Sequence, residues 1–491
     1  MRWSCLGTQE AAEGVIVTHV WQVAFLAAGL GAGAAPSTGL DADVRQVLAE
    51  RVEALAGGDD GIGIVVGIVD PKGRSVVSYG HAGRESRKPL DGDTGFEIAS
   101  VTKVFTALLL ADMARRGEVA LTDPVAKHLP RGVTVPERGG RSITLLDLAT
   151  HTSGLPFMPD ELPVADGSVT AREAAGRLTQ FLARYELRRD IGSEWDYSNI
   201  GYWLLGEALA ARAGTDFESL LKARVLDPLG MKNTAITLSP KLKAALAVGH
   251  NAVLQPALPW SAASTYADMA AAGGLVSTAN DLSKLLAVAM GYEPSPLAAS
   301  MAAMLESRRP IGGKAQQALG WVVTGQGDAD KLISHEGGSW GFASVVAWDP
   351  LRRVGLVVLS NQVAGVSDIA QHLLRPDVPL QKPPAARHKE IAVDPALLED
   401  CVGRYEVEDE GVFAVAREGG YLTIQAPISW GLPKLRLRPE SSKDFFVAEL
   451  PLRVTAQMDG EGRVKGLLIH PPRGQRAMVA ARVLPPNGTE R

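Results

Sequence analysis

The sequence predicts an α/β protein of the α+β kind: an antiparallel sheet flanked by helices, with a helical subdomain and a small C-terminal all-β barrel. One pair of strand-like runs comes early, helical patterns fill roughly residues 100–290, and several strand-like runs follow. Strands from both ends of such a segment can pair in one antiparallel sheet, which leaves the helices between them as an insertion. With 491 residues, the chain is too long for one compact core, so two or three domains are expected.

The strands of the predicted sheet are marked by β-branched and aromatic residues between turn signals. The stretch "GIGIVVGIVDPKGRSVVSYGHAG" (61–83) predicts a hairpin, because two Val/Ile/Tyr-rich runs flank the turn "DPKG". Later, "LGWVVTG", "KLISHEGG", "FASVVAWDP" and "VGLVVLSNQ" predict four consecutive strands.

The C-terminal part is set off by a Pro-rich, charged stretch at 375–395, which predicts a linker. Beyond it, 396–491 holds short strand-like runs at regular spacing, which indicates a small barrel or sandwich. The main domain is therefore expected at 41–374.

The N-terminus contains the apolar run "GVIVTHVWQVAFLAAGLGAGAAPS" with the small-residue pattern Ala32-Gly33-Ala34. This pattern favours a signal peptide over 1–34 and a periplasmic or secreted protein. Arg2 is the only basic residue ahead of the run, and two acidic residues precede it, so an ordinary N-terminal segment is the alternative.

Composition excludes several classes of function. Net charge is −5 and the chain lacks a long Lys/Arg run, which disfavours nucleic-acid and anionic-membrane partners. The two cysteines and nine histidines form no metal-ligand spacing, so we expect no metal and no cofactor.

Ser100 and Lys103 stand one helical turn apart at the start of "SVTKVFTALLLADM". On a helix their side chains can meet. Burial and the positive end of the helix both disfavour the lysine ammonium, and a neutral lysine can accept the proton of a serine hydroxyl. Ser-x-x-Lys is frequent by chance, so alone it favours a surface or paired lysine.

Two further segments can complete a site. Tyr197 and Asn199 precede an apolar helical run, where Tyr197 can move a proton to a leaving group and Asn199 can hold Lys103 or a substrate carbonyl. The alternative there is a helix cap made by Ser198 or Asn199, and both readings can hold together. His335 opens a strand-like run and can bind an anionic group or move protons; its alternative is a loop histidine without a role.

A rival nucleophile is Ser339, because Gly337-Gly338-Ser339-Trp340-Gly341 fits Gly-x-Ser-x-Gly. A nucleophile elbow requires a strand, a sharp turn and then a helix. A strand-like run follows instead, which argues against Ser339.

Ser100-Val101-Thr102-Lys103, Tyr197-Ser198-Asn199 and His335-Glu336-Gly337 together resemble, in order and spacing, the three motifs of serine β-lactamase-like proteins. The resemblance covers about 41–374 and is strongest to class C β-lactamases, D-alanyl-D-alanine carboxypeptidases and family VIII-type carboxylesterases. "HTSGLP" and "AAGGLVSTANDLSKLL" are also similar to recurrent segments of these proteins. The region 396–491 resembles the lipocalin-like β domain that often follows such hydrolases.

The resemblance implies an acyl-enzyme on Ser100, with Lys103 as general base and Tyr197 as the proton donor to the leaving group. It further implies that Asn199 orients the substrate amide. The backbone N–H groups of Ser100 and Gly338 would form the oxyanion hole, and His335 and Gly337 would line the substrate site.

The third motif departs from the Lys-Thr-Gly of many β-lactamases. An acidic Glu336 facing the cleft would repel a substrate carboxylate, unless strand alternation turns it away. We therefore expect a serine hydrolase acting on the amide bond of a small molecule or peptide. A carboxylesterase and a non-catalytic penicillin- or peptide-binding module are the alternatives.

Overall fold

The structure is a computed structural model of the chain. It describes residues 40–56, 61–85, 87–158, 171–251, 254, 256–257, 269–325, 327, 330–363, 366–381, 389–408, 411–427, 434–447, 452–470 and 477–483. The expected signal peptide at 1–34 and residues 382–388 of the expected linker at 375–395 lie outside these residues.

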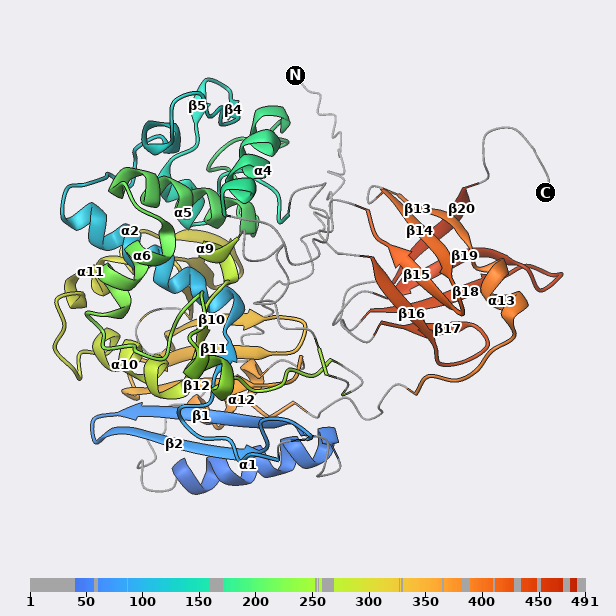
Figure 1. The fold of residues 1–491 in the computed structure, drawn as a ribbon, viewed down its shortest axis with the longest axis horizontal. Coiled ribbons are helices and arrows are strands. Elements are labelled where there is room, and N and C mark those ends of the chain that lie inside the picture. Colours follow the sequence, from blue (N-terminus) through green and yellow to red (C-terminus); the bar gives the residue numbers. More distant parts are fainter. Residues whose placement is uncertain are drawn as a thin grey trace, which may run out of the picture.

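The central feature is an eight-stranded sheet built from both ends of its domain (Figure 1). In sheet order its strands are β2 (Gly73–Gly80), β1 (Gly63–Asp70), β12 (Val354–Ser360), β11 (Ala343–Asp349), β10 (Leu332–Gly338), β9 (Val322–Thr324), β8 (Ala315–Gln317) and β7 (Arg309–Gly312). Strand β1 runs antiparallel to β12, with Ile64 opposite Ser360 and Val69 opposite Gly355. The predicted pairing of the early hairpin with the late strands is confirmed.

Strands β7 and β8 were not expected from the sequence. Their residues are polar or half-exposed, and Pro310 and Gly312 interrupt the first of them. They extend the sheet beyond β9 as an irregular edge, without the Val/Ile alternation that identifies a strand from sequence.

Each face of the sheet has its own core. Ile64, Val66 and Ile68 of β1 point to one face, where they pack with helices α1 (Leu40–Ala56) and α12 (Ser367–Leu374). Val65 and Val69 point to the other face, which the helical region covers. Successive side chains of β1 thus alternate between the two cores, as expected of a strand that is buried on both faces.

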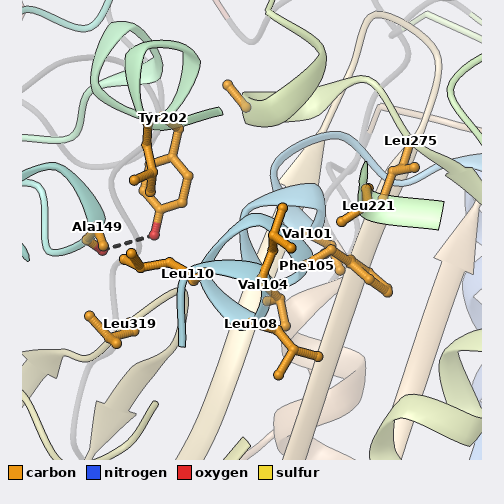
Figure 2. Close-up of a cluster of buried hydrophobic side chains, with 14 of the residues drawn as sticks. Val101, Val104, Phe105, Leu108, Leu110, Ala149, Tyr202, Leu221, Leu275 and Leu319 are labelled. Carbon is orange, nitrogen blue, oxygen red and sulfur yellow. Dashed lines mark hydrogen bonds between the residues drawn. The ribbon is translucent and has the colours of Figure 1, made fainter. Parts of the chain in front are cut away.

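Helix α2 (Thr102–Arg115) is the centre of the helical region, and it is buried from Thr102 to Met113. A helix that is apolar on all sides is typical of a core position. Figure 2 shows its side chains Val104, Phe105 and Leu108 among residues from several other segments.

The other helices of this region are α3 (Leu145–Ala149), α4 (Ala171–Arg184), α5 (Asn199–Ala213), α6 (Phe217–Leu221), α7 (Pro240–Ala245), α9 (Ala270–Gly273), α10 (Ala279–Ala289) and α11 (Ala298–Ala303). Two short strand pairs accompany them, β3 (Phe96–Glu97) with β6 (Val276–Ser277), and β4 (Glu137–Arg138) with β5 (Arg141–Ser142).

The C-terminal part is a closed antiparallel barrel, as predicted. It follows the short helix α13 (Pro395–Asp400) and consists of β13 (Gly403–Val407), β14 (Gly411–Glu418), β15 (Tyr421–Gln425), β16 (Leu435–Pro439), β17 (Asp444–Phe446), β18 (Arg453–Met458), β19 (Val464–His470) and β20 (Met478–Val483). Tyr405, Phe413 and Phe445 are buried in its core, in keeping with an eight-stranded barrel whose interior is filled by side chains. The domain boundaries at 374 and 396 stay predictions.

Candidate active site

Ser100 lies in a tight turn between a short strand and the central helix. Strand β3 leads into a 3₁₀ turn, η1 (Ala99–Val101), and η1 runs directly into α2. The Ile98 N–H donates to the Leu275 carbonyl at 3.0 Å, and Thr102 Oγ1 accepts from the Leu275 N–H at 3.2 Å. Ala99 has φ = 44°, a left-handed conformation that is unusual for a residue other than glycine. The turn that carries Ser100 is therefore strained and held on both sides.

Lys103 points back from the first turn of α2 toward Ser100, as the spacing predicts. Its Nζ lies 3.0 Å from Ser100 Oγ, 2.7 Å from Asn199 Oδ1 and 2.7 Å from the Ala272 carbonyl oxygen. The side chain is fully buried, and the rings of Tyr197 and Tyr202 flank the amine at 4.8 and 5.6 Å from their centroids. Burial lowers the pKa of Lys103 well below its ordinary value.

The three contacts of Nζ fit a neutral amine. Asn199 Oδ1 and the Ala272 carbonyl can only accept hydrogen bonds, so they take the two N–H groups of the amine. In the neutral amine this leaves the nitrogen lone pair for the remaining neighbour, the Ser100 hydroxyl, whose Oγ lies 3.0 Å from Nζ. This arrangement lets Ser100 donate its proton to Lys103.

Tyr197 is positioned by the turn that opens helix α5. Ser198 is the N-cap of that helix, and its Oγ accepts the Gly201 N–H at 2.9 Å. Burial raises the pKa of Tyr197 above its ordinary value, while a hydrogen bond with the Ser100 side chain opposes that rise. The Ser100 hydroxyl thus lies between the Lys103 amine and the Tyr197 phenol.

Asn199 accepts a hydrogen bond from Lys103 through Oδ1, and its amide nitrogen Nδ2 makes a weak hydrogen bond. Among the described residues, the one hydrogen-bond partner of Nδ2 is the Met158 thioether at 3.6 Å, a weak acceptor. A substrate carbonyl can replace that contact at little cost. The segment therefore supplies both the helix cap on Ser198 and the hydrogen bond between Lys103 and Asn199.

Strand β10 brings Gly337 against the Ser100 turn. A Cβ atom on Gly337 would lie 2.2 Å from the Ile98 carbonyl oxygen and 3.1 Å from the Ser100 nitrogen. Ser344 on β11 adds a second tie, because its Oγ donates to the same Ile98 oxygen at 2.8 Å. Only glycine fits at 337, and Gly338 follows at the end of the strand, next to the Ser100 turn.

His335 lies buried on the same strand, and its Nδ1 lies 2.7 Å from the Gly320 carbonyl oxygen. A carbonyl only accepts, so Nδ1 carries the proton and Nε2 of the neutral ring does not. Burial and the charge of Lys103 lower the pKa of His335 to about 3, against the Gly320 hydrogen bond, which raises it. Near neutral pH, His335 can form hydrogen bonds but carries no charge for an anion.

Glu336 faces away from Ser100. It pairs across the strands with Val345, whose side chain belongs to the core beneath α1 and α12. Its neighbour Gly337 pairs with Ser344, whose side chain reaches Ile98 on the opposite face. Because directly paired residues share a face, Glu336 lies on the far side of the sheet from Ser100.

Ser339 does not occupy a nucleophile elbow. It lies between β10 and β11, and its N–H donates to the Phe342 carbonyl at 2.9 Å within the turn that joins them. A strand follows this turn where the elbow requires a helix.

Two groups at the site were not predicted as functional. The Ala272 carbonyl binds Lys103, and His151 packs against Tyr197 with ring centroids 4.3 Å apart. They belong to the segments "AAGGLVSTANDLSKLL" and "HTSGLP", in which the sequence indicated no site residue. The repeated occurrence of both segments in the resembled proteins was the only available signal.

The described residues hold no group of three or more His, Cys, Asp or Glu side chains that could bind a metal ion. Among the same residues, no helix combines the length and apolar character needed to cross a bilayer.

Comparison with known proteins agrees with this geometry. The Beta-lactamase family model matches residues 44–377. The D-alanyl-D-alanine-carboxypeptidase/endopeptidase AmpH of Escherichia coli is 30% identical over 342 residues, covering 64% of this chain and 86% of that protein. A beta-lactamase of Pseudomonas fluorescens is 27% identical over 353 residues, covering 65% and 94%.

Among solved structures, a beta-lactamase/D-alanine carboxypeptidase from Yersinia pestis in complex with citrate aligns with a TM-score of 0.56 and 26% identity. The alignment covers 67% of this chain and 94% of that one. A class C beta lactamase from Rhodobacter sphaeroides aligns with a TM-score of 0.56 and 25% identity, covering 70% and 98%. The chain therefore belongs to the beta-lactamase family of serine hydrolases.

Proposed function

We propose that this protein hydrolyses amide bonds through an acyl-enzyme on Ser100, as a β-lactamase or D-alanyl-D-alanine carboxypeptidase. The observation that carries the proposal is the setting of Lys103: a fully buried amine with two hydrogen-bond acceptors at 2.7 Å and Ser100 Oγ at 3.0 Å. The names of its relatives, a carboxypeptidase/endopeptidase and a beta-lactamase, support the same substrate classes.

In the acylation step, Ser100 Oγ attacks the carbonyl carbon as its proton passes to Lys103 Nζ. The backbone N–H groups of Ser100 and Gly338 stabilise the oxyanion, which the proximity of Gly337 to the Ser100 nitrogen supports. Tyr197 then protonates the leaving nitrogen, and collapse of the intermediate breaks the C–N bond. The proton on Lys103 returns to the Tyr197 oxygen, so the acyl-enzyme forms with both bases restored.

Deacylation repeats these transfers with water. Water attacks the acyl carbon and gives a proton to the Tyr197–Lys103 pair. The same pair then protonates Ser100 Oγ as the ester bond breaks. Asn199 orients the substrate amide through Nδ2, which exchanges its contact with the weakly accepting Met158 thioether for the substrate carbonyl.

A carboxylesterase on the same scaffold is the second candidate. One observation favours it: His335 is neutral, so the third motif offers no positive charge to a substrate carboxylate. Esters without a carboxylate do not need that charge. The position of Glu336 on the far face removes the repulsion that its sequence position suggested.

The test compares three substrates on the purified chain: nitrocefin, a D-Ala-D-Ala peptide and a short-chain nitrophenyl ester. Hydrolysis of either amide substrate, lost in Ser100→Ala, supports the proposal. An ester-only profile would refute the amidase assignment and favour the esterase. Binding of penicillin without turnover of any substrate would favour a non-catalytic module.

We further propose export to the periplasm or the medium, on the composition of residues 1–34. Cell fractionation followed by N-terminal sequencing checks this proposal. A chain that keeps Met1 and stays with the cytosolic fraction contradicts it.

A further inference from the structure

His151 has no part in the proposed reaction, yet it lies directly behind the proton donor. It belongs to the segment 151–158, which runs alongside the segment 196–199. Ser198 Oγ donates to the Pro156 carbonyl at 2.7 Å, and the Asn199 N–H donates to the Phe157 carbonyl at 3.0 Å. The two segments are thus held together over their length.

His151 itself holds three consecutive residues of the second segment. Its carbonyl oxygen accepts the Asp196 N–H at 2.7 Å, and its Nδ1 accepts the Ser198 N–H at 3.0 Å. Between these two ties, its ring stacks on Tyr197 with centroids 4.3 Å apart and planes 26° apart. The backbone on both sides of Tyr197 and the phenol ring are therefore fixed by one residue.

The protonation of His151 follows from these contacts. Nδ1 accepts from a backbone amide, so the proton of the neutral ring lies on Nε2, which has no hydrogen-bond partner among the described residues. Burial lowers the pKa of His151 well below its ordinary value. A fully buried, neutral ring with one unpaired nitrogen is costly for an ordinary core position.

The backbone of His151 carries a further cost. Its φ is 56°, in the left-handed region that residues with a side chain rarely adopt. Strain of this kind persists where the surrounding structure requires it, and it is concentrated at functional sites.

We propose that His151 is a positioning residue, which holds the Tyr197 phenol at the Ser100 hydroxyl by clamping the backbone on both sides of Tyr197 and stacking on its ring. The inference rests on the proposed function, because it assigns Tyr197 its role in proton transfer. A displacement of about 1 Å at a reacting group can cost roughly 100-fold in rate. Loss of the clamp should therefore slow acylation and leave substrate binding almost unchanged.

Two variants separate the two parts of the clamp. His151→Phe keeps an aromatic ring but loses the acceptor for the Ser198 N–H. His151→Asn keeps an acceptor near the place of Nδ1 but loses the ring. The control is His128→Phe, which replaces another buried histidine, bonded to Asp123 and outside the site described above.

The measured quantity is the rate of covalent labelling of Ser100 by a fluorescent penicillin, normalised to the folded fraction. His151→Phe should slow the maximal labelling rate by about 10- to 100-fold, with the half-saturating probe concentration within about twofold of wild type. His151→Asn should slow the maximal labelling rate by about 10-fold. If His151→Phe does not fold, the rate of His151→Asn alone tests whether His151 positions Tyr197. The control should label at the wild-type rate per folded molecule.

A double-mutant cycle tests whether the effect passes through Tyr197. In a Tyr197→Phe background, His151→Phe should change the labelling rate by less than about twofold, because the phenol it positions is gone. An equal loss in both backgrounds, or a wild-type rate in both His151 variants, would overturn this inference alone. If the wild-type chain is not labelled at Ser100 at all, the proposed function fails as well.

Discussion

Replacing Lys103 by methionine removes the amine and keeps an unbranched side chain of similar length. Ser100 then has no base within hydrogen-bonding distance, because Nζ at 3.0 Å is the only nitrogen base bonded to its Oγ among the described residues. General-base catalysis contributes about 100- to 10,000-fold. We expect the acylation rate to fall by that factor, which corresponds to about 3–5 kcal/mol of barrier.

The effect of Lys103→Met on stability should be much smaller than its effect on rate. The variant leaves Asn199 Oδ1 and the Ala272 carbonyl without their donor, at a cost of about 1–3 kcal/mol each. Against that, it removes a fully buried amine whose desolvation opposes folding. The two contributions oppose each other, so the free energy of unfolding should change by no more than about 2–3 kcal/mol.

The assay is single-turnover acylation with nitrocefin or the nitrophenyl ester, whichever the wild type hydrolyses. Lys284→Met is the matched control, since Lys284 also lies on a buried helix and donates to a carbonyl, that of Gly230, away from the site. It should retain the wild-type rate. Wild-type kcat/KM should rise with pH through the lowered pKa of Lys103, as the amine becomes neutral.

Lys103→Arg supplies the result that would refute this reasoning. Arginine keeps the positive charge and the hydrogen-bond donors but cannot deprotonate in a protein. If Lys103 acts as a base, the arginine variant should be as slow as Lys103→Met. If the arginine variant keeps more than about a tenth of the wild-type rate, Lys103 acts as a cationic donor and the proposed mechanism is wrong.

Three further predictions concern the surroundings of the nucleophile. Gly337→Ala should slow acylation by about 100-fold, because the new Cβ would lie 2.2 Å from the Ile98 oxygen and push β10 away from the Ser100 turn. The control is Gly176→Ala, which should keep the wild-type rate because a Cβ atom there would have no neighbour within 4 Å. Ala99→Gly should raise the free energy of unfolding, measured by urea titration, by up to about 1 kcal/mol, because φ = 44° strains alanine and not glycine. A urea midpoint below that of the wild type would contradict the strain. His335 has a pKa of about 3 in the folded chain, so below about pH 6.5 the unfolded chain takes up a proton that the folded chain does not, and stability falls as pH decreases. Between pH 7 and pH 5 this group should remove about 2 kcal/mol, and His335→Gln should lose that much less than wild type over the same range.

The sequence was informative where local pattern decides structure. The hairpin around "DPKG", the four late strands and the buried helix after Ser100 follow from β-branched runs, turn residues and apolar periodicity. Helical spacing allowed Lys103 to meet Ser100, and the two later motifs favoured that contact over a surface or paired lysine. The pairing of β1 with β12, although distant in sequence, follows from the need of both strands for a partner.

What could not be predicted depends on groups that sequence does not distinguish. Every residue has a carbonyl, so nothing marked that of Ala272 as a ligand of Lys103 or that of Gly320 as the acceptor that fixes the His335 tautomer. The three contacts of His151 depend on the backbone path of residues 196–198, which the sequence does not reveal. The face of Glu336 depended on register, where a slip of one residue would reverse the answer.

The most direct test of the central claim is to locate the covalent adduct. The chain is incubated with a fluorophosphonate probe and, separately, with benzylpenicillin, and the adduct is mapped by peptide mass spectrometry. The mechanism predicts one adduct per chain, on Ser100, absent in Ser100→Ala and formed far more slowly in Lys103→Met. An adduct on Ser339, or one that persists in Ser100→Ala, would contradict it.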